Sequence, residues 1–245
     1  MAEGTRVNKY MAQAGLCSRR EADRLIESGA VTVDGKRAET GMKVTEKSVV
    51  RVGKKEVKAK GKDEMVLLAV NKPVGIVCTE EKREKNNFID FLKYPTRITY
   101  IGRLDKDSEV LILMTNNGDI INKMMRAVNE HEKEYKVTVD KPITDAFIEK
   151  MSNGIPILDT VTRKCKVEKI GKYTFRIILT QGLNRQIRRM CEYLGYKVTR
   201  LQRLRVMNIE LGNFKPGAYR HVTEEEIKEL YELIKYSSNE TVIKP

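Results

Sequence analysis

One short stretch of this sequence, residues 18–36, constrains the fold more than any other. It begins with SRRE at 18–21, the spacing of a capping box, in which the Ser18 hydroxyl and the Glu21 carboxylate each accept from the other residue's backbone amide. This box predicts a helix from about Arg19 to Ser28. VTVDGK then alternates apolar and polar residues before an Asp-Gly pair, which is typical of a tight β-hairpin.

Positive charge is concentrated around this stretch. The 245 residues carry 47 Lys and Arg against 34 Asp and Glu, a formal net charge of +13, and residues 1–62 hold 15 basic residues against 8 acidic ones. Arg19, Arg20 and Arg24 gather at and after the start of the predicted helix. Guanidinium groups suit bidentate contacts with phosphate, so these arginines are candidate ligands of a nucleic-acid backbone. A solvated basic face or an anionic membrane surface would also account for such a charge.

Several classes of protein are disfavoured by what the sequence lacks. No apolar run reaches the roughly 18 residues that a membrane-spanning helix needs, and the N-terminus does not have the basic-then-apolar order of a secretory signal. Four scattered cysteines and two distant histidines argue against a disulfide framework and a zinc site. Glycine-rich nucleotide-binding motifs and the G-x-S-x-G motif of hydrolases are absent. We expect a cytoplasmic protein that uses no membrane, metal or cofactor.

The chain divides into two expected domains. Residues 53–62 are lysine-rich without a periodic apolar face, and predict a linker over 53–63 between a domain at 1–52 and a larger one at 64–236, with a tail at 237–245. In the larger domain strands often follow strands without a helix between them, so we expect an α+β fold on a mixed, largely antiparallel sheet. Strands are predicted at Met65–Val70, Val110–Met114, Tyr135–Val139, Arg163–Val167, Phe175–Leu179 and Val206–Leu211. Helices are predicted at Asn87–Leu92, Asp119–Met125, Asp145–Ser152, Arg185–Leu194 and Glu224–Tyr236, with caps at Thr144, Asn184 and Thr223.

Three polar segments carry the candidate chemistry. GRLDKDS at 102–108 forms a charged loop just before an apolar strand, where a rigid scaffold can hold catalytic groups. KEYKV at 133–137 begins a strand with Tyr135 at an alternating position, and RQIRRM at 185–190 enters a helix with three arginines. Each segment also has a plainer interpretation: loop carboxylates cap or pair, a strand tyrosine packs in a core, and a basic helix faces solvent. Read singly, none of them identifies an enzyme.

Two family resemblances combine these patterns. Residues 6–44 resemble the S4 RNA-binding module of ribosomal protein S4 and of many RNA-modifying enzymes. GRLDKDS, EYKV and RQIRRM, in this order and at these separations, resemble the pseudouridine synthases, and the similarity spans nearly all of residues 5–235. Within that family the chain is similar to the branch that modifies ribosomal RNA and carries an N-terminal S4 module. The resemblance implies an isomerase that needs no cofactor or metal and whose partner is 23S ribosomal RNA.

The same resemblance implies three catalytic residues. Asp105 matches the essential carboxylate, and Arg188 matches the residue that pairs with it. If Arg188 lies within about 4 to 6 Å of Asp105, its positive charge would favour the charged form of that carboxylate in a closed pocket. Tyr135 matches the residue that stacks on the target base. Whether Asp105 acts as a nucleophile, or stabilises an oxocarbenium-like sugar and removes a proton, stays open.

The residues implied to bind RNA lie in both domains. Arg103 matches the position that fills the space left by a flipped nucleotide or holds that nucleotide, and Ile187 would form an apolar floor of the pocket. Arg19, Arg20 and Arg24 would hold the RNA backbone, which positions an RNA without reading its sequence.

One residue departs from the family pattern. The family commonly has glycine after Asp-Ser-Glu, where this chain has Val110. Because a β-branched residue disfavours a positive φ, either the backbone at Val110 is ordinary β or the entry to the strand is altered.

Two alternatives to 23S ribosomal RNA modification stay open. One is the same reaction on small-subunit ribosomal RNA or on tRNA. The other is a non-catalytic RNA-binding or ribosome-assembly factor, which would keep the basic surface without needing Asp105. We also expect a monomer whose S4 module is mobile in the absence of RNA.

Overall fold

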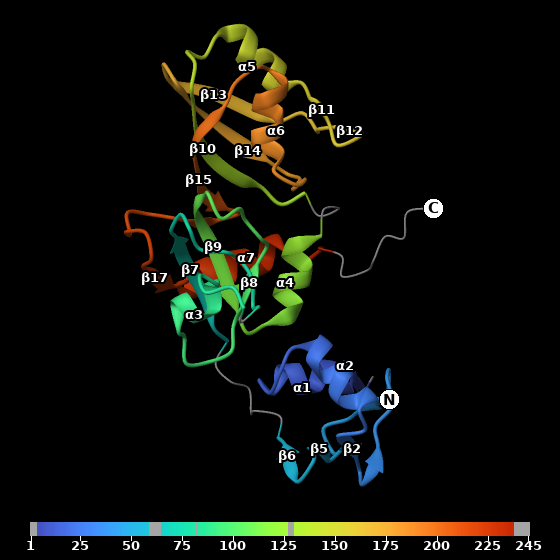
Figure 1. Cartoon of the computed structure of the whole chain (residues 1–245). Coiled ribbons are helices and arrows are strands. Elements are labelled where there is room, and N and C mark those ends of the chain that lie inside the picture. Colours follow the sequence, from blue (N-terminus) through green and yellow to red (C-terminus); the bar gives the residue numbers. More distant parts are fainter. Residues whose placement is uncertain (1–3, 59–64, 82, 127–129, 238–245) are drawn as a thin grey trace. The chain divides into compact units, whose positions relative to one another are not determined.

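The computed structural model describes residues 4–58, 65–81, 83–126 and 130–237. The chain forms two compact units: Met1–Met65 with Asn116–Gly118, and Val66–Thr115 with Asp119–Pro245 (Figure 1). Residues 59–63 of the expected linker and 238–245 of the expected tail lie outside the described residues. The mobility of the S4 module therefore stays a prediction.

The N-terminal unit packs two helices, α1 (Val7–Gln13) and α2 (Arg19–Glu27), with a small sheet. The sheet has the strand order β3-β2-β5-β6, and alternate residues such as Val31 and Val50 are fully buried in the core. A separate pair joins β1 to β4. The strands are β1 (Thr5–Arg6), β2 (Val31–Val33), β3 (Lys36–Arg37), β4 (Lys43–Val44), β5 (Val50–Val52) and β6 (Lys55–Val57).

The hairpin and the helix cap of this unit were both predicted. Asp34 and Gly35 have φ of 51° and 80°, the two positive values that a type I′ hairpin turn requires, so the hairpin is confirmed. The Ser18 hydroxyl accepts from the Glu21 amide at 3.1 Å, as expected. The Glu21 carboxylate, however, accepts from Arg24 Nη1 at 3.2 Å, so the capping box is only half formed.

The N-terminal unit extends into the expected linker. Residues 55–57 form β6, which pairs with β5, and the Val57 side chain is only 6% exposed in the core of this unit. The lysine-rich composition hid this strand because β6 is an edge strand with a single buried side chain. The prediction of a linker from residue 53 is therefore corrected: no linker begins before the end of β6.

The larger unit is built on a sheet of nine described strands, with the order β13-β14-β10-β15-β9-β7-β17, in which β8 pairs with β9 and β16 with β15. Among the described strand pairs, only β15 and β9 run parallel, so the mixed, largely antiparallel sheet is confirmed. The strands are β7 (Leu67–Lys72), β8 (Thr99–Ile101), β9 (Glu109–Thr115), β10 (Lys133–Val139), β13 (Lys166–Gly171), β14 (Thr174–Leu179), β15 (Val198–Val206), β16 (Ile209–Glu210) and β17 (Tyr219–His221), and a separate hairpin pairs β11 (Pro156–Ile157) with β12 (Thr160–Val161).

Helices cover this sheet and close two buried clusters. Phe147 of α5 (Asp145–Ser152) and Met190 of α6 (Gln186–Tyr193) share a cluster with Phe175 of β14, and Phe88 of α3 (Phe88–Leu92) packs with Ile112 of β9. The predicted caps at Thr144 and Thr223 are present, the second as a complete capping box. The remaining helices are α4 (Gly118–Met125) and α7 (Glu224–Leu233). None of the described helices is long and apolar enough to cross a bilayer.

Three element predictions need correction. The strand expected at Val206–Leu211 is interrupted, because Met207 adopts a φ of 53° in a turn between β15 and β16. The strand expected at Arg163–Val167 starts later, as β13. The helix expected to reach Tyr236 ends at Leu233, one turn earlier.

The backbone at Val110 is ordinary β. Val110 lies in β9, pairs with Lys72 of β7 and Arg203 of β15, and is fully buried. The first of the two expected alternatives therefore holds, and the departure from glycine adds a packed side chain rather than a change of strand entry.

The partly buried amine of Lys133 predicts a pH dependence of stability. Burial lowers the pKa of Lys133 from 10.5 to about 8, helped by the charge of Arg203, so between these values the folded state holds fewer protons than the unfolded one. The free energy of unfolding of the wild type should therefore rise with pH in this window, relative to Lys133→Met, by up to about 3 kcal/mol. Urea unfolding of both proteins at pH 7.5 and 10 measures this difference. Parallel pH profiles would contradict it.

Candidate active site

Asp105 lies in the loop between β8 and β9. Gly102, with a φ of 83°, begins the loop, and Ser108 ends it with an amide that donates to the Asp105 carbonyl at 3.2 Å. Ser108 is 1% exposed, whereas the Asp105 side chain is 28% exposed. The loop is thus anchored in the protein at its Ser108 end and leaves the carboxylate accessible.

A buried lysine donates a hydrogen bond to the backbone of this loop. Lys72, the last residue of β7, is fully buried, and its Nζ donates to the carbonyls of Pro73 and Ile76 at 2.8 Å and of Lys106 at 3.4 Å. Burial lowers the pKa of Lys72, and the nearby Cys78, Asp107 and Asp105 oppose that shift. The sequence interpretation missed this residue. A lysine at the end of a buried apolar strand, just before a proline, was the available signal.

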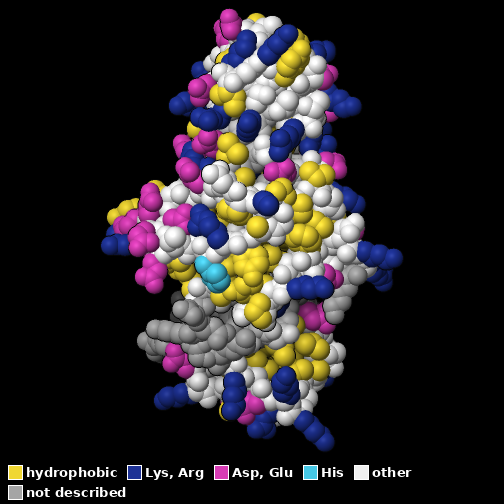
Figure 2. Space-filling model, turned by 90° about the vertical axis from the view of Figure 1, so that its left-hand side faces the viewer, with side chains coloured by type: hydrophobic (Ala, Val, Ile, Leu, Met, Phe, Trp, Pro, Cys, Tyr) yellow, Lys and Arg dark blue, Asp and Glu magenta, His cyan; other side chains and the backbone are white. Residues whose placement is uncertain are grey.

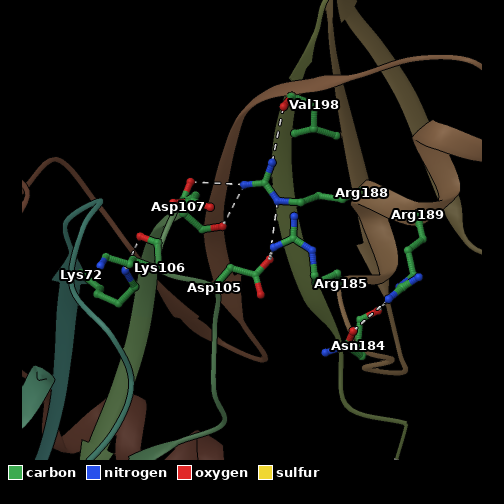
Figure 3. Close-up of polar contacts among 10 residues, drawn as sticks. Lys72, Asp105, Lys106, Asp107, Asn184, Arg185, Arg188, Arg189 and Val198 are labelled. Carbon is green, nitrogen blue, oxygen red and sulfur yellow. Dashed lines mark hydrogen bonds and ion pairs between the residues drawn. The ribbon is translucent and has the colours of Figure 1, made fainter. Parts of the chain in front are cut away.

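Arg188, on α6, contacts Asp105 and ties its loop to the neighbouring strand (Figure 3). Its Nε lies 3.5 Å from Asp105 Oδ2. Its other nitrogens donate to the carbonyls of Asp107 at 3.2 Å and Val198 at 3.4 Å, and to the Ser108 hydroxyl at 3.3 Å. With a side chain only 13% exposed, Arg188 is held in place by several acceptors.

A second arginine, which the motif interpretation did not single out, contacts the same carboxylate. Arg185 Nη1 donates to Asp105 Oδ2 at 3.2 Å. Arg185 also corrects the helix prediction, because it and not Asn184 is the N-cap of α6, with a φ of 49° and no side-chain capping bond. Asn184 instead accepts from Arg189 through its carbonyl and its side-chain oxygen.

The arrangement is therefore one accessible carboxylate with two cations on one of its oxygens. Both guanidinium groups approach Oδ2, and within the described part of the chain Oδ1 accepts no hydrogen bond. Opposite charges at this distance hold a carboxylate in one orientation. Such a group can act as a nucleophile, a proton acceptor or a stabiliser of positive charge. Among the described residues, no three side chains of the types that ligate metals lie together.

Tyr135 and Ile187 belong to the large buried cluster of this unit. Tyr135 lies on β10 beside a bulge opposite Arg203 and is 7% exposed, and Ile187 lies on α6 and is 4% exposed. Ile187 stands between Arg185 and Arg188 in the sequence, so α6 and its N-cap residue present an apolar side chain to the core and two arginines to Asp105. The structure thus brings Asp105 and Arg188 together and places the tyrosine and isoleucine in the adjoining core cluster.

The remaining predicted residues are exposed cations. Arg103 lies on the Asp105 loop. Arg19 and Arg20 lie at the start of α2, and Arg24 pairs with Glu21. In the N-terminal unit, Arg19 also lines a shallow pocket together with Arg6, Lys9 and Lys43.

The positively charged side chains do not form one continuous patch on the face drawn in Figure 2. There, lysine and arginine side chains are scattered among acidic and hydrophobic ones. On this face, positive charge is therefore present as separate small groups of cations.

Comparison with known proteins identifies two domains. A family model described as RNA pseudouridylate synthase matches residues 66–193, and the S4 domain model matches residues 5–50. The chain is 56% identical over 236 residues to the dual-specificity RNA pseudouridine synthase RluF of Salmonella typhi, covering 96% of this chain and 82% of that protein. For the RluF of Escherichia coli K12 the identity is 53% over 240 residues, with 98% and 82% covered.

More distant relatives match over similar lengths. The ribosomal large subunit pseudouridine synthase B of Bacillus subtilis is 34% identical over 243 residues, covering 96% of this chain and 98% of that protein. A crystal structure of a pseudouridylate synthase aligns with a TM-score of 0.67 at 25% identity, covering 92% of this chain and 99% of that one. Nearly the whole length of the chain is thus shared with these proteins.

Proposed function

This chain belongs to the RNA pseudouridylate synthase family and is an enzyme that isomerises uridine in RNA, and from that premise we propose that it modifies 23S ribosomal RNA with Asp105 as its essential carboxylate. The observation that carries the proposal is the pairing of an accessible Asp105 with the anchored Arg188 at 3.5 Å. The S4 domain adds an RNA-binding module.

The reaction breaks one glycosidic bond and forms another. The bond between uracil N1 and ribose C1′ breaks, the uracil turns, and C5 bonds to C1′. N1 gains a proton and C5 loses one, so atoms balance without an oxidant or reductant. The protein must therefore stabilise the sugar while the base is detached and move two protons.

In this proposal Asp105 acts on the sugar. Its Oδ1 is without a hydrogen bond from any described residue, whereas Oδ2 faces Arg185 and Arg188. Oδ1 can attack C1′ as a nucleophile, stabilise an oxocarbenium-like sugar, or take a proton from C2′. In each route Arg188 holds the carboxylate in position through its bonds to the Asp107 carbonyl and the Ser108 hydroxyl.

Other side chains receive the base. Tyr135 would stack on the uracil, and Ile187 would form the apolar floor below it. The target nucleotide must first leave its stack, at a cost of a few kcal/mol that is smallest in loops and bulges. Arg103, exposed on the same loop as Asp105, would fill the space that the flipped nucleotide leaves or hold that nucleotide.

The S4 domain would hold the RNA backbone. Arg19, Arg20 and Arg24 lie on α2, and the pocket lined by Arg6, Arg19 and Lys43 concentrates positive charge on one side of that domain. Contacts of this kind give salt-dependent affinity that is independent of sequence. Affinity and chemistry would thus lie in different domains.

The choice of 23S ribosomal RNA rests on the relatives. Both RluF proteins and the Bacillus synthase B, which is named for the large subunit, match over nearly the whole chain. The words "dual-specificity" in the names of the RluF relatives favour a second RNA substrate, for which tRNA is the class to test. We further propose that the enzyme works in the cytoplasm as a monomer, without a metal or cofactor.

Base-resolved mapping tests the substrate. Total RNA from a strain with the gene deleted would be incubated with the wild-type enzyme, and pseudouridine located by carbodiimide-blocked primer extension. We expect new stops in 23S ribosomal RNA, and none when Asp105→Asn replaces the wild type. Stops confined to small-subunit ribosomal RNA or tRNA would contradict the 23S assignment while leaving the role of Asp105 intact.

A further inference from the structure

Arg185 has no task in the proposed reaction, although it approaches Asp105 as closely as Arg188 does. Its Nη1 lies 3.2 Å from Asp105 Oδ2, and Arg188 Nε lies 3.5 Å from the same atom. In Figure 3 both guanidinium groups face Asp105, while Arg189, from the same helix, turns to Asn184. The contact therefore depends on the position of Arg185 and not merely on a basic helix.

The two arginines differ in how firmly they are held. Arg188 has three further acceptors and a side chain 13% exposed. Arg185 makes no other side-chain hydrogen bond within the described part of the chain, and its side chain is 42% exposed. A single exposed ion pair contributes little to the stability of the folded protein, and its attraction is screened by salt. Arg185 can thus leave Asp105 without disturbing the loop, and Arg188 cannot.

The backbone at Arg185 is unusual as well. Arg185 is the N-cap of α6 in the left-handed region, with φ 49° and ψ 35°, and its side chain does not cap the helix. Glycine and asparagine adopt this conformation more readily than arginine. Residues held in such conformations concentrate at sites of function. A long cationic side chain therefore stands where a small residue would be more stable.

The substrate supplies a stronger partner than Asp105. When the sugar of the target nucleotide lies against Asp105, the phosphate attached to that sugar lies nearby. Phosphate oxygens form strong bidentate hydrogen bonds with guanidinium groups, and the start of a helix favours an anion. The exposed Arg185 is at the start of α6 and beside Asp105, so it is placed to reach that phosphate.

We propose that Arg185 is a phosphate-binding residue that moves from Asp105 to the backbone phosphate of the target nucleotide when RNA binds. This inference rests on the proposed role of Asp105. In the free enzyme Arg185 occupies one oxygen of the carboxylate. In the complex it holds the nucleotide, and Asp105 keeps Arg188 as its anchored partner.

Steady-state kinetics on 23S ribosomal RNA at several salt concentrations test this transfer. For Arg185→Gln we expect KM to rise about tenfold, kcat to stay within about threefold, and the slope of log KM against log salt concentration to fall by about 0.7 to 0.9, the loss of one phosphate contact. Arg185→Lys should recover most of the salt slope, since it keeps the charge. Arg185→Asn should raise KM as Arg185→Gln does without lowering the melting temperature, because asparagine tolerates the left-handed conformation.

A matched control and a clear contrary result are available. Arg163 has a similar exposure of 43% and one carboxylate partner, Glu130 at 2.8 Å, so Arg163→Gln should leave KM, kcat and the salt slope unchanged. If Arg185 only supported the charge of Asp105, Arg185→Gln would lower kcat and leave KM and the salt slope unchanged, which would overturn the inference. An active Asp105→Asn protein would overturn the proposed function itself, and RNA binding by the Arg185 variants would still show whether a phosphate contact is lost.

Discussion

Asp105→Asn should lower the single-turnover rate of pseudouridine formation by at least about 10³-fold, because general acid–base and nucleophilic roles both require the carboxylate. The change is nearly isosteric, the side-chain oxygen of asparagine can still accept from Arg185, and the bonds of Arg188 to the Asp107 carbonyl and the Ser108 hydroxyl are not altered. The loop should therefore keep its structure, and RNA should bind about as tightly as it binds to the wild type. Rate measurements at saturating enzyme, with filter binding of the same RNA, separate the two quantities.

Asp107 provides the matched control for this substitution. It lies on the same loop and is exposed, and only its backbone carbonyl contacts Arg188, at 3.2 Å. Asp107→Asn removes the same charge from the same loop without touching that carbonyl, so the rate should stay within about threefold of the wild type. A loss equal to that of Asp105→Asn would show that loop charge, and not a specific carboxylate, is what the reaction needs.

Arg188→Met should produce the second largest effect. It removes the anchored cation from Asp105 and leaves the Asp107 and Val198 carbonyls and the Ser108 hydroxyl without their donor. Loss of one preorganised charged donor typically costs about 10²- to 10³-fold in kcat, and an unpaired buried polar group adds about 1 to 3 kcal/mol of destabilisation. We therefore expect both a slower chemical step, measured in single turnover, and a lower melting temperature.

Two further variants assign these effects to the contacts of Arg188. Arg188→Lys keeps the charge but has no planar fork to span several acceptors, so its rate should fall between those of the wild type and Arg188→Met. Arg189→Met alters an arginine of the same helix that binds Asn184 instead, and should leave the rate near that of the wild type. A normal rate in folded Arg188→Met would mean that Asp105 does not depend on this pair.

Much of the fold follows from local patterns in the sequence. The Asp34-Gly35 hairpin and the caps at Thr144 and Thr223 were predicted because each depends on residues only a few positions apart. Strand β9 was predicted because its apolar residues form an uninterrupted run, and β10 because its buried residues alternate with more exposed ones. These features need no knowledge of the tertiary structure.

Strand β15 was missed because its partners are distant in sequence. The arginines in its sequence are typical of exposed residues. Arg203, however, is only 4% exposed and donates to the Leu111 carbonyl of β9 at 2.8 Å. Arg205 is paired with Glu132 and Glu134. A polar strand becomes a central one only when such partners are brought to it by the fold.

The residues of the candidate site divide in the same way: some are found through sequence motifs, and others only through their contacts in the structure. Asp105 and Arg188 were found through motifs that resemble those of a known family, and the structure brings them together. Lys72 and Arg185 were not, because their importance lies in contacts with residues more than 30 positions away, the Lys106 carbonyl and the Asp105 carboxylate. The backbone of Arg185 also displaced the expected Asn184 cap. Contacts of this kind depend on the tertiary fold and leave no periodic signal.

The most direct test of the central claim is release of the hydrogen at uracil C5, which must leave when C5 bonds to C1′. The substrate would be 23S ribosomal RNA labelled with tritium at C5 of uridine, prepared from a strain with the gene deleted. Our account predicts that the wild type and Asp107→Asn release tritium to water in proportion to the pseudouridine formed, and that Asp105→Asn binds this RNA and releases none. Release by Asp105→Asn at the rate of the wild type would contradict the assignment of the chemistry to Asp105.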